Sequence, residues 1–224
     1  MEKAIKKYWA IFTIPTVAAF SIGFVWPFLW GIYLSFNKFQ TLKKMEFVGF
    51  SNYLKVFQDE SFLHAFWFTA LFTVVSTIVI NVLAFMVALL LIRKIRGQNV
   101  FRMVFFMPNL IGGIVLGYIW QSLLNGLLYN WGKPLLALSA TEGFWGLVIL
   151  MGWQQIGYMM IIYIAGLQNV SPDLIEAAKI DGASTQDVLK HVTIPMVMPS
   201  ITICTFLTLT NSFKLFDQNL ALTG

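Results

Sequence analysis

Five apolar stretches, each long enough to cross a lipid bilayer, dominate this sequence. They cover residues 9–36, 64–92, 103–124, 143–167 and 196–213. A spanning helix needs about 20 mostly apolar residues, because the hydrocarbon core is about 30 Å thick. Only 11% of the residues are charged, whereas a soluble domain carries about 25%. We therefore predict an all-α membrane protein, a polytopic helical bundle in which residues 1–224 form a single transmembrane domain.

Proline and glycine mark where these helices should bend. Pro15 and Pro27 lie near the two ends of the first span and are expected to kink it. Pro108 and the pair Gly112-Gly113 lie inside the third span. The stretch 49–53, Gly-Phe-Ser-Asn-Tyr, predicts a turn into a short surface helix between the first two spans.

Basic residues give the orientation. Nine of the 15 Lys and Arg residues fall on one side of the predicted topology, in the N-terminal head, the loop 93–102 and the loop 168–195. Arg93, Lys94 and Arg96 form a dense cluster beside a span. Positively charged loops stay in the cytoplasm, so we place the N-terminus and the loop 168–195 there. The positive residues accompany spans and form no stripe with stacking aromatics, so nucleic acid is not an expected partner.

The loop 168–195 is the one long polar stretch between spans. Pro172 suits the first position of a helix, and the Ser171 hydroxyl is placed to cap it. Gly182 then predicts a left-handed end to that helix. Ser184 and Asp187 predict a capping box that opens a second helix. We expect this second helix to end before Pro195, which disfavours helical geometry at the residue preceding it.

The same loop carries a family pattern. Glu176-Ala177-Ala178, Gly182 and Val192-Thr193-Ile194-Pro195 have the order and spacing of the "EAA" loop. The chain thus resembles a membrane subunit of a binding-protein-dependent ATP-binding-cassette (ABC) importer. Residues 213–217 and 222–224 look like the sugar-permease branch related to the maltose transporter. The resemblance implies the type I importer permease fold, located in the cytoplasmic membrane of a bacterium or archaeon, with a sixth span expected beyond the five.

What the resemblance implies for partners is equally specific. A second homologous permease subunit, two cytoplasmic ATPase subunits and an extracytoplasmic solute-binding protein are expected, and ATP and Mg would be bound by the ATPases. The ATPase-docking residues implied are Glu176, Ala177, Ala178, Asp181, Gly182, Ile194 and Pro195. Glu176 would pair with a basic residue of the ATPase. The alternatives are a solvated Glu176 favoured by the helix dipole, and a local capping role for Asp181.

Polar side chains inside the spans are the candidates for a substrate path. Met151, Gln155 and Tyr158 follow a helical spacing, as do Thr208, Asn211, Ser212 and Leu215. Aligned on the EAA-like loop, both faces match sugar-contacting positions of maltose-type permeases. The path residues implied are Gln155, Tyr158, Thr208, Asn211 and Ser212. Hydrogen bonding between helices is the competing interpretation. Weaker candidates are Asn81, Asn109, Gln121 and Gln154.

Other function classes lack the residues they need. His64 and His191 fall on opposite sides of the membrane, so we expect neither a metal site nor a catalytic group. No phosphate-binding loop occurs, so this chain should not itself bind ATP. A secondary transporter would need inverted repeats and a buried charged site, whereas Lys214 and Asp217 are expected at the interface. An intramembrane enzyme would need clustered carboxylates. An importer for another solute, such as glycerol phosphate, remains open.

Overall fold

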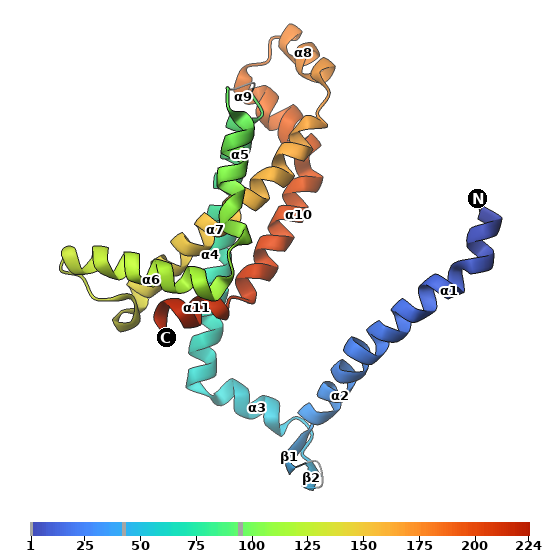
Figure 1. The fold of residues 1–224 in the computed structure, drawn as a ribbon, viewed down its shortest axis with the longest axis vertical. Helices are drawn as coiled ribbons and strands as arrows, with labels where there is room; N and C mark the ends of the chain where they lie inside the picture. Colours follow the sequence, from blue (N-terminus) through green and yellow to red (C-terminus); the bar gives the residue numbers. More distant parts are fainter. Residues whose placement is uncertain (1, 42–43, 94–95) are drawn as a thin grey trace. The chain divides into compact units, whose positions relative to one another are not determined.

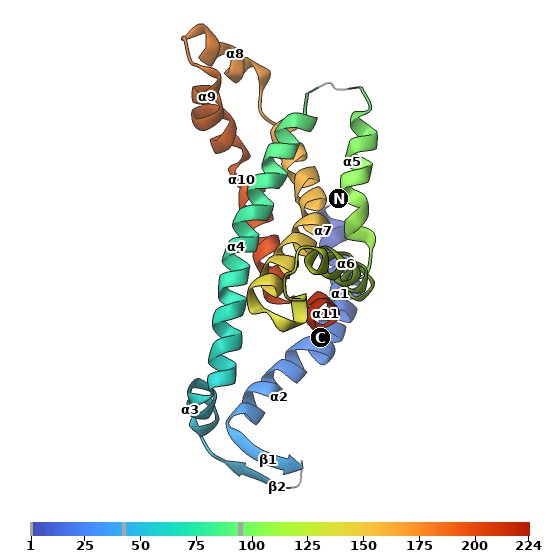
Figure 2. The same ribbon diagram turned by 90° about the vertical axis from the view of Figure 1, so that its left-hand side faces the viewer.

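A computed structural model describes residues 2–41, 44–93 and 96–224 (Figures 1 and 2). Contacts divide the described residues into two compact units, one ending at Phe66 and the other running from Trp67 to Gly224. We describe each unit by itself, and the expected single domain stays a prediction. Lys94 of the basic cluster lies outside the described residues.

The first unit begins with one long helix. It comprises α1 (Glu2–Phe20), a π-helical turn (Ser21–Val25) and α2 (Trp26–Ser35). Its apolar part, Trp9–Ser35, matches the predicted first span. The π-helical turn immediately precedes Pro27, whose ring would clash with the carbonyl four residues back in a regular helix. The wider turn lets the helix continue past this proline.

A hairpin and a short helix follow. Strand β1 (Asn37–Thr41) pairs antiparallel with β2 (Lys44–Phe47), with Asn37 opposite Phe47 and a bulge between Phe39 and Thr41. The sequence did not lead us to expect this hairpin. Helix α3 (Ser51–Gln58) confirms the predicted surface helix.

The second unit is built around α7 (Ala140–Gln168). Two-thirds of its most apolar window is buried, a larger share than in any other spanning helix of the described residues. Helix α4 (Glu60–Leu91), most of which belongs to this unit, buries Ile80, Ala84 and Ala88 on one face. This spacing of four residues places the three side chains on one stripe of the helix, which faces the core. The predicted second and fourth spans thus match α4 and α7.

The third span is broken, where we expected one helix over 103–124. It consists of α5 (Gln98–Phe106), a 3₁₀ turn (Met107–Leu110) and α6 (Gly113–Asn130), and the two helices are bent by 102°. Pro108 removes a backbone donor at the break, and Gly112 adopts an extended conformation directly before α6. Within the described residues, four helices are long and apolar enough to span a membrane, and the bent pair makes a fifth if it is one span.

The fifth spanning helix begins earlier than predicted. Helix α9 (Thr185–Val188), a π-helical turn (Leu189–Thr193) and α10 (Ile194–Phe213) run on as one helical span. The predicted end before Pro195 is therefore wrong. The π-helical turn widens the helix where the Pro195 ring would otherwise meet a carbonyl, so the chain passes the proline without unwinding.

The chain ends in α11 (Asp217–Thr223), which packs against α6. A Cβ atom on Gly117 would come within 2.5 Å of the Ala221 Cβ, so these helices approach closely through small residues. The Gln121 amide also donates to the Leu222 carbonyl at 3.2 Å. Figures 1 and 2 show α11 at the end of the second unit opposite to α8 (Pro172–Ile180) and α9.

Candidate coupling loop and polar path

Helix α8 has the start and stop that the sequence predicts, apart from one detail. Pro172 occupies its first turn, and Ser171 holds the N-cap position with extended backbone. The Ser171 hydroxyl accepts no capping hydrogen bond, so that prediction is wrong. Asp173 instead places a negative charge in the first turn, where the helix dipole favours it.

The end of α8 is a Schellman motif. Gly182 has a φ of +85°. The Ala183 amide donates to the Ala178 carbonyl at 2.9 Å, and the Gly182 amide donates to the Lys179 carbonyl at 3.1 Å. This pair of bonds satisfies the last carbonyls of the helix. The predicted left-handed stop at Gly182 is confirmed.

The second helix of the loop is also capped as predicted. The Ser184 hydroxyl accepts a hydrogen bond from the Asp187 amide, and the Asp187 carboxylate accepts one from the Ser184 amide. Since this helix continues into α10, α8 is joined by a short turn to a continuous helix that ends at Phe213.

The two faces of α8 differ. Ile175 and Ala178 are half-buried, and Ile175 packs against the core. Glu176 and Ala177 are exposed, and Ile180 is 85% exposed. One exposed apolar side chain alone does not mark a contact surface, so Ile180 is a docking candidate through its place beside Glu176. Sequence reasoning missed Ile180, although its spacing of four from Glu176 places both residues on one face.

The remaining docking candidates lie around this helix. Asp181 is exposed at the C-cap of α8. Ile194 is half-buried and Pro195 exposed in the first turn of α10. In both views α8 and α9 lie at the same end of the second unit as the last turn of α4 and the first turn of α5 (Figures 1 and 2). The docking role of all these residues stays a prediction.

Two predicted path residues meet across α7 and α10. The Asn211 amide donates to the Gln155 side-chain oxygen at 3.3 Å. Gln155 is 8% exposed, and Asn211 is half-buried. Tyr158, one turn further along α7, is half-buried and packs near the Phe106 ring at the end of α5, with ring centroids 6.4 Å apart.

Thr208 and Ser212 are almost fully buried. The Thr208 hydroxyl donates to the Cys204 carbonyl at 2.7 Å, and the Ser212 hydroxyl donates to the Thr208 carbonyl at 2.8 Å. The Asn81 amide of α4 donates to the Thr208 hydroxyl at 3.2 Å and accepts from the Tyr163 hydroxyl of α7 at 2.7 Å. Asn81, a weaker path candidate in the sequence, thus joins three helices. Thr208 and Ser212 lie where hydrogen bonding between helices is observed, and their contact with substrate stays a prediction.

Gln154 ties the break in the third span to the rest of the unit. Its amide donates to the Ile111 carbonyl at 3.2 Å and its oxygen accepts from the Gln218 amide at 3.1 Å. These bonds hold α7 to the α5–α6 break and to α11. The contacts indicate a structural role, which the sequence alone did not distinguish from a place on the path.

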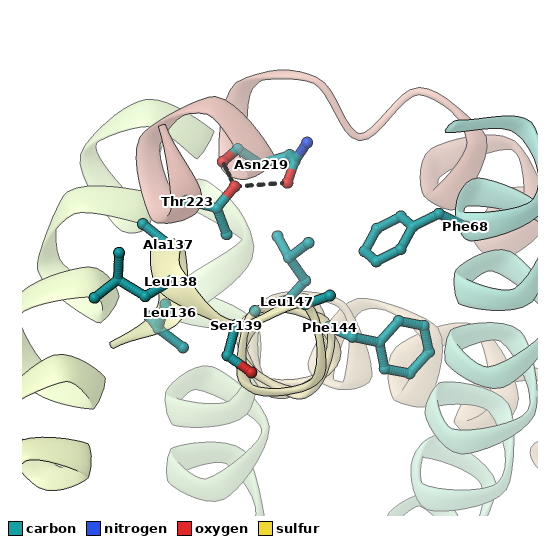
Figure 3. Close-up of a pocket in the computed structure, with 11 residues that line it drawn as sticks. Phe68, Leu136, Ala137, Leu138, Ser139, Phe144, Leu147, Asn219 and Thr223 are labelled. Atoms are coloured by element: carbon teal, nitrogen blue, oxygen red, sulfur yellow. Dashed lines mark hydrogen bonds between the residues drawn. The ribbon is translucent and has the colours of Figure 1, made fainter. Parts of the chain in front are cut away.

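A pocket of about 300 Å³ lies at the α11 end of the unit. Figure 3 shows Asn219 and Thr223 of α11 facing Ser139 and Leu147 across it, with the Phe68 ring at one side. None of the predicted path residues lines it. A neighbouring cavity of about 70 Å³ shares Phe68, Leu147 and Asn219 and includes Ser212 in its wall. In the described residues, no three His, Cys, Asp or Glu side chains form a group able to hold a metal ion.

Comparison with known proteins gives matches in both sequence and fold. The family model described as "Binding-protein-dependent transport system inner membrane component" matches residues 80–224. This region begins within α4, which ends at Leu91, and contains all of the second unit from there onward, including the loop 168–195.

Two relatives match nearly the whole chain. A probable starch degradation products transport system permease protein of Thermoanaerobacterium thermosulfurigenes is 42% identical, over 97% of this chain and 76% of its own length. A multiple sugar-binding transport system permease protein of Streptococcus mutans is 29% identical, over 100% of this chain and 81% of its own length. The crystal structure of a bacterial ABC transporter involved in the import of the acidic polysaccharide alginate shares the fold, with a TM-score of 0.78 at 20% identity, over 99% of this chain and 79% of that chain.

Proposed function

The chain belongs to the family of binding-protein-dependent transport system inner membrane components, and from this premise we propose that it forms half of the path of an ATP-driven importer for a sugar or oligosaccharide. The relatives named for starch degradation products and for multiple sugars support this substrate class. The second half of the path would come from a homologous permease subunit. An extracytoplasmic binding protein would deliver the substrate.

The observation that carries the proposal is the exposed face of α8. This helix ends in the Schellman motif at Gly182 and is joined by a short turn to the continuous helical span Thr185–Phe213. Glu176 and Ala177 face water beside the exposed Ile180. This face fits a groove on a cytoplasmic ATPase, with Glu176 pairing a basic residue and Ala177 permitting close approach. Two ATPases would hold ATP and Mg, and this chain would hold neither. The distribution of Lys and Arg supports a cytoplasmic location for the N-terminus as well.

The coupling would be mechanical. The helical span from Thr185 to Phe213 is unbroken, and at 1.5 Å per residue about 35 Å of helix separate Thr185 from Thr208. A shift of α8 caused by closure of the ATPases therefore reaches Thr208 as movement of one rigid element. The hydrogen bond between Asn81 and Thr208 would transmit this movement to α4, and the bond between Asn81 and Tyr163 would transmit it to α7. ATP would favour the outward-open arrangement because the closed ATPases bind only that arrangement well.

Gln155 and Asn211 are the best placed to meet a sugar. Their mutual bond uses the Gln155 oxygen and an Asn211 N–H. Among the hydrogen bonds of the described residues, the Gln155 amide nitrogen and the Asn211 oxygen do not take part, so the two N–H donors of the Gln155 amide and the Asn211 oxygen as acceptor remain for sugar hydroxyls. Tyr158 supplies an aromatic ring nearby. Thr208 and Ser212 complete the proposed path. Both are buried, and they would act by holding α10 in place next to Asn211.

Reconstitution tests the proposal. The chain is placed in proteoliposomes with its partner permease, the ATPases and the binding protein, and uptake of labelled oligosaccharide is measured with and without ATP. We expect ATP-dependent uptake, and we expect Glu176→Lys to abolish both uptake and the stimulation of ATP hydrolysis while the chain still inserts. Glu46→Lys, the same charge change in β2, is the matched control and should transport normally.

The outcomes separate the alternatives. Uptake of glycerol phosphate instead of sugar would keep the importer and change its cargo. Uptake without the ATPases, driven by an ion gradient, would instead favour a secondary transporter. Normal uptake by Glu176→Lys would contradict the docking role.

A further inference from the structure

A groove in the first unit lies between the end of α2, strand β1, α3 and the start of α4, with a volume of about 530 Å³. This falls in the size range of ligand pockets, about 300–1,000 Å³. Its wall is mostly apolar and includes Leu34, Phe39, Tyr53, Val56, Phe57 and Phe62.

The side-chain amide nitrogens and the hydroxyls in this wall already form hydrogen bonds within the unit. The Asn52 amide donates to the carbonyls of Ser35 and Asn37, at 2.9 and 3.1 Å. The Asn37 amide donates to the Tyr33 carbonyl at 2.6 Å. The Ser35 hydroxyl donates to the Ile32 carbonyl and lies 2.6 Å from the Tyr53 hydroxyl. A sugar needs several free donors and acceptors, whereas the amide nitrogens and hydroxyls here are engaged and most of the wall is apolar, so this groove suits an apolar occupant.

Helix α3 is amphipathic on its outer side. Phe50, directly before it, and Leu54 and Phe57 within it recur at helical spacing and are 69%, 63% and 66% exposed. The neighbouring stripe is polar and exposed at Lys55 and Gln58. A short helix with these two faces lies flat in the interface between headgroups and acyl chains. One candidate span ends at Ser35 and the next begins at Glu60, so this region directly joins two membrane spans and lies close to the bilayer surface.

We propose that α3 lies in the headgroup region of the bilayer and that the groove beside it, which shares Phe57 with the apolar stripe, holds one acyl chain of a membrane glycerophospholipid. The stripe formed by Phe50, Leu54 and Phe57 faces the acyl region, and Lys55 on the polar stripe meets the headgroup phosphate. The proposal depends on the membrane location of the chain alone, so it stands whether or not the transported solute is a sugar.

Photolabelling tests the groove. The full chain with its co-purifying subunits is placed in nanodiscs of phosphatidylcholine that carries a diazirine on one acyl chain, and lipid adducts within residues 34–62 are mapped by mass spectrometry. We expect adducts on groove residues. Val56→Asp puts a carboxylate in the groove and should reduce them at least about ten-fold. Gln58→Asp, with the same new residue on the polar stripe, should leave them unchanged.

A second measurement does not depend on the folding of Val56→Asp. Nitroxide labels are attached to Leu54→Cys and Lys55→Cys in a Cys204→Ala background. Successive helical residues are 100° apart, so the label at 54 should collide mainly with oxygen, which partitions into lipid, and the label at 55 with a water-soluble nickel chelate. Equal nickel access at both positions, or lipid adducts on the spans and none on the groove residues, would overturn the proposal.

Discussion

Two glycines of α7 should respond in opposite directions to the same substitution. Gly152 and Gly157 are both buried in this helix. A Cβ atom on Gly157 would lie 1.7 Å from the Phe105 carbonyl oxygen and 2.3 Å from its carbon, both backbone atoms of α5. A Cβ atom on Gly152 would meet only the Ile156 side-chain terminus, at an ordinary 3.8 Å. The close approach of α5 to α7 therefore requires a glycine at position 157 but not at position 152.

The magnitudes follow from these distances. Gly157→Ala requires the α5 backbone to retreat until the Cβ–oxygen distance grows from 1.7 Å to at least 3.0 Å. A backbone shift of this kind costs about 3 kcal/mol, the upper part of the range for overpacked cores. Gly152→Ala requires no shift and gains about 0.5–1 kcal/mol from the lower flexibility of the unfolded chain.

The assay is thermal unfolding of the two variants in the same detergent or nanodisc. At about 2–4 °C per kcal/mol for a chain of this size, Gly157→Ala should unfold roughly 6–12 °C below the parent, and Gly152→Ala should unfold at or slightly above it. Equal midpoints for the two variants would refute the reasoning, because only their different distances to α5 separate them.

Three further predictions concern the loop and the path. Asn81→Leu leaves the buried Tyr163 hydroxyl without its acceptor and should cost about 1–3 kcal/mol; adding Tyr163→Phe should recover part of the loss in a double-mutant cycle of unfolding, and additive effects would show that the bond is absent. Gly182→Ala forces a side chain into left-handed backbone at a cost of about 1 kcal/mol, and should slow transport while the binding protein still docks; unchanged transport would show that α8 tolerates another end. Gln155→Leu should raise the sugar concentration for half-maximal uptake about ten-fold through loss of a hydrogen bond, with Asn211→Leu having a similar effect, and an unaltered uptake curve would remove both residues from the path.

Local signals in the sequence were sufficient for the caps of the coupling loop. Gly182 ends α8, and Ser184 with Asp187 opens the next helix, because each cap is a bond between residues a few positions apart. The predicted helix end before Pro195 was wrong because the outcome there depends on contacts that are not local. A proline removes one backbone hydrogen bond, which can be read from the sequence. Whether the helix then stops or continues through a π-helical turn depends on the packing of the residues that follow, such as Val197, which is only 1% exposed.

Contacts between distant elements could not be predicted. The third span contains Pro108 and two adjacent glycines, and the sequence located that weak point without giving its 102° bend. The bend is fixed by packing of α5 at Gly157 and by the Gln154 bonds to Ile111 and Gln218. The hairpin in the first unit was missed because its strands are short: β2 alternates polar and apolar residues over only four positions, and β1 contains a single apolar residue, Phe39.

The candidate path shows the same limit. Helical spacing placed Gln155 on one face of α7 and Asn211 on one face of α10, and the structure joins them. The Asn81 contacts with Thr208 and Tyr163 require three helices to meet, so no spacing rule within one helix identifies them.

The central claim is that α8 touches an ATPase, and crosslinking tests it most directly. A photoreactive benzoylphenylalanine replaces Ile180 on the exposed face of α8, or Ile203, a matched exposed isoleucine on α10. After irradiation of membranes that contain all subunits, the account predicts an adduct between position 180 and an ATPase subunit, and none from position 203. If position 180 crosslinks only to its own chain, or if Ile180→Cys in a Cys204→Ala background reacts with an impermeant thiol reagent added outside the cell, the coupling role of α8 is contradicted.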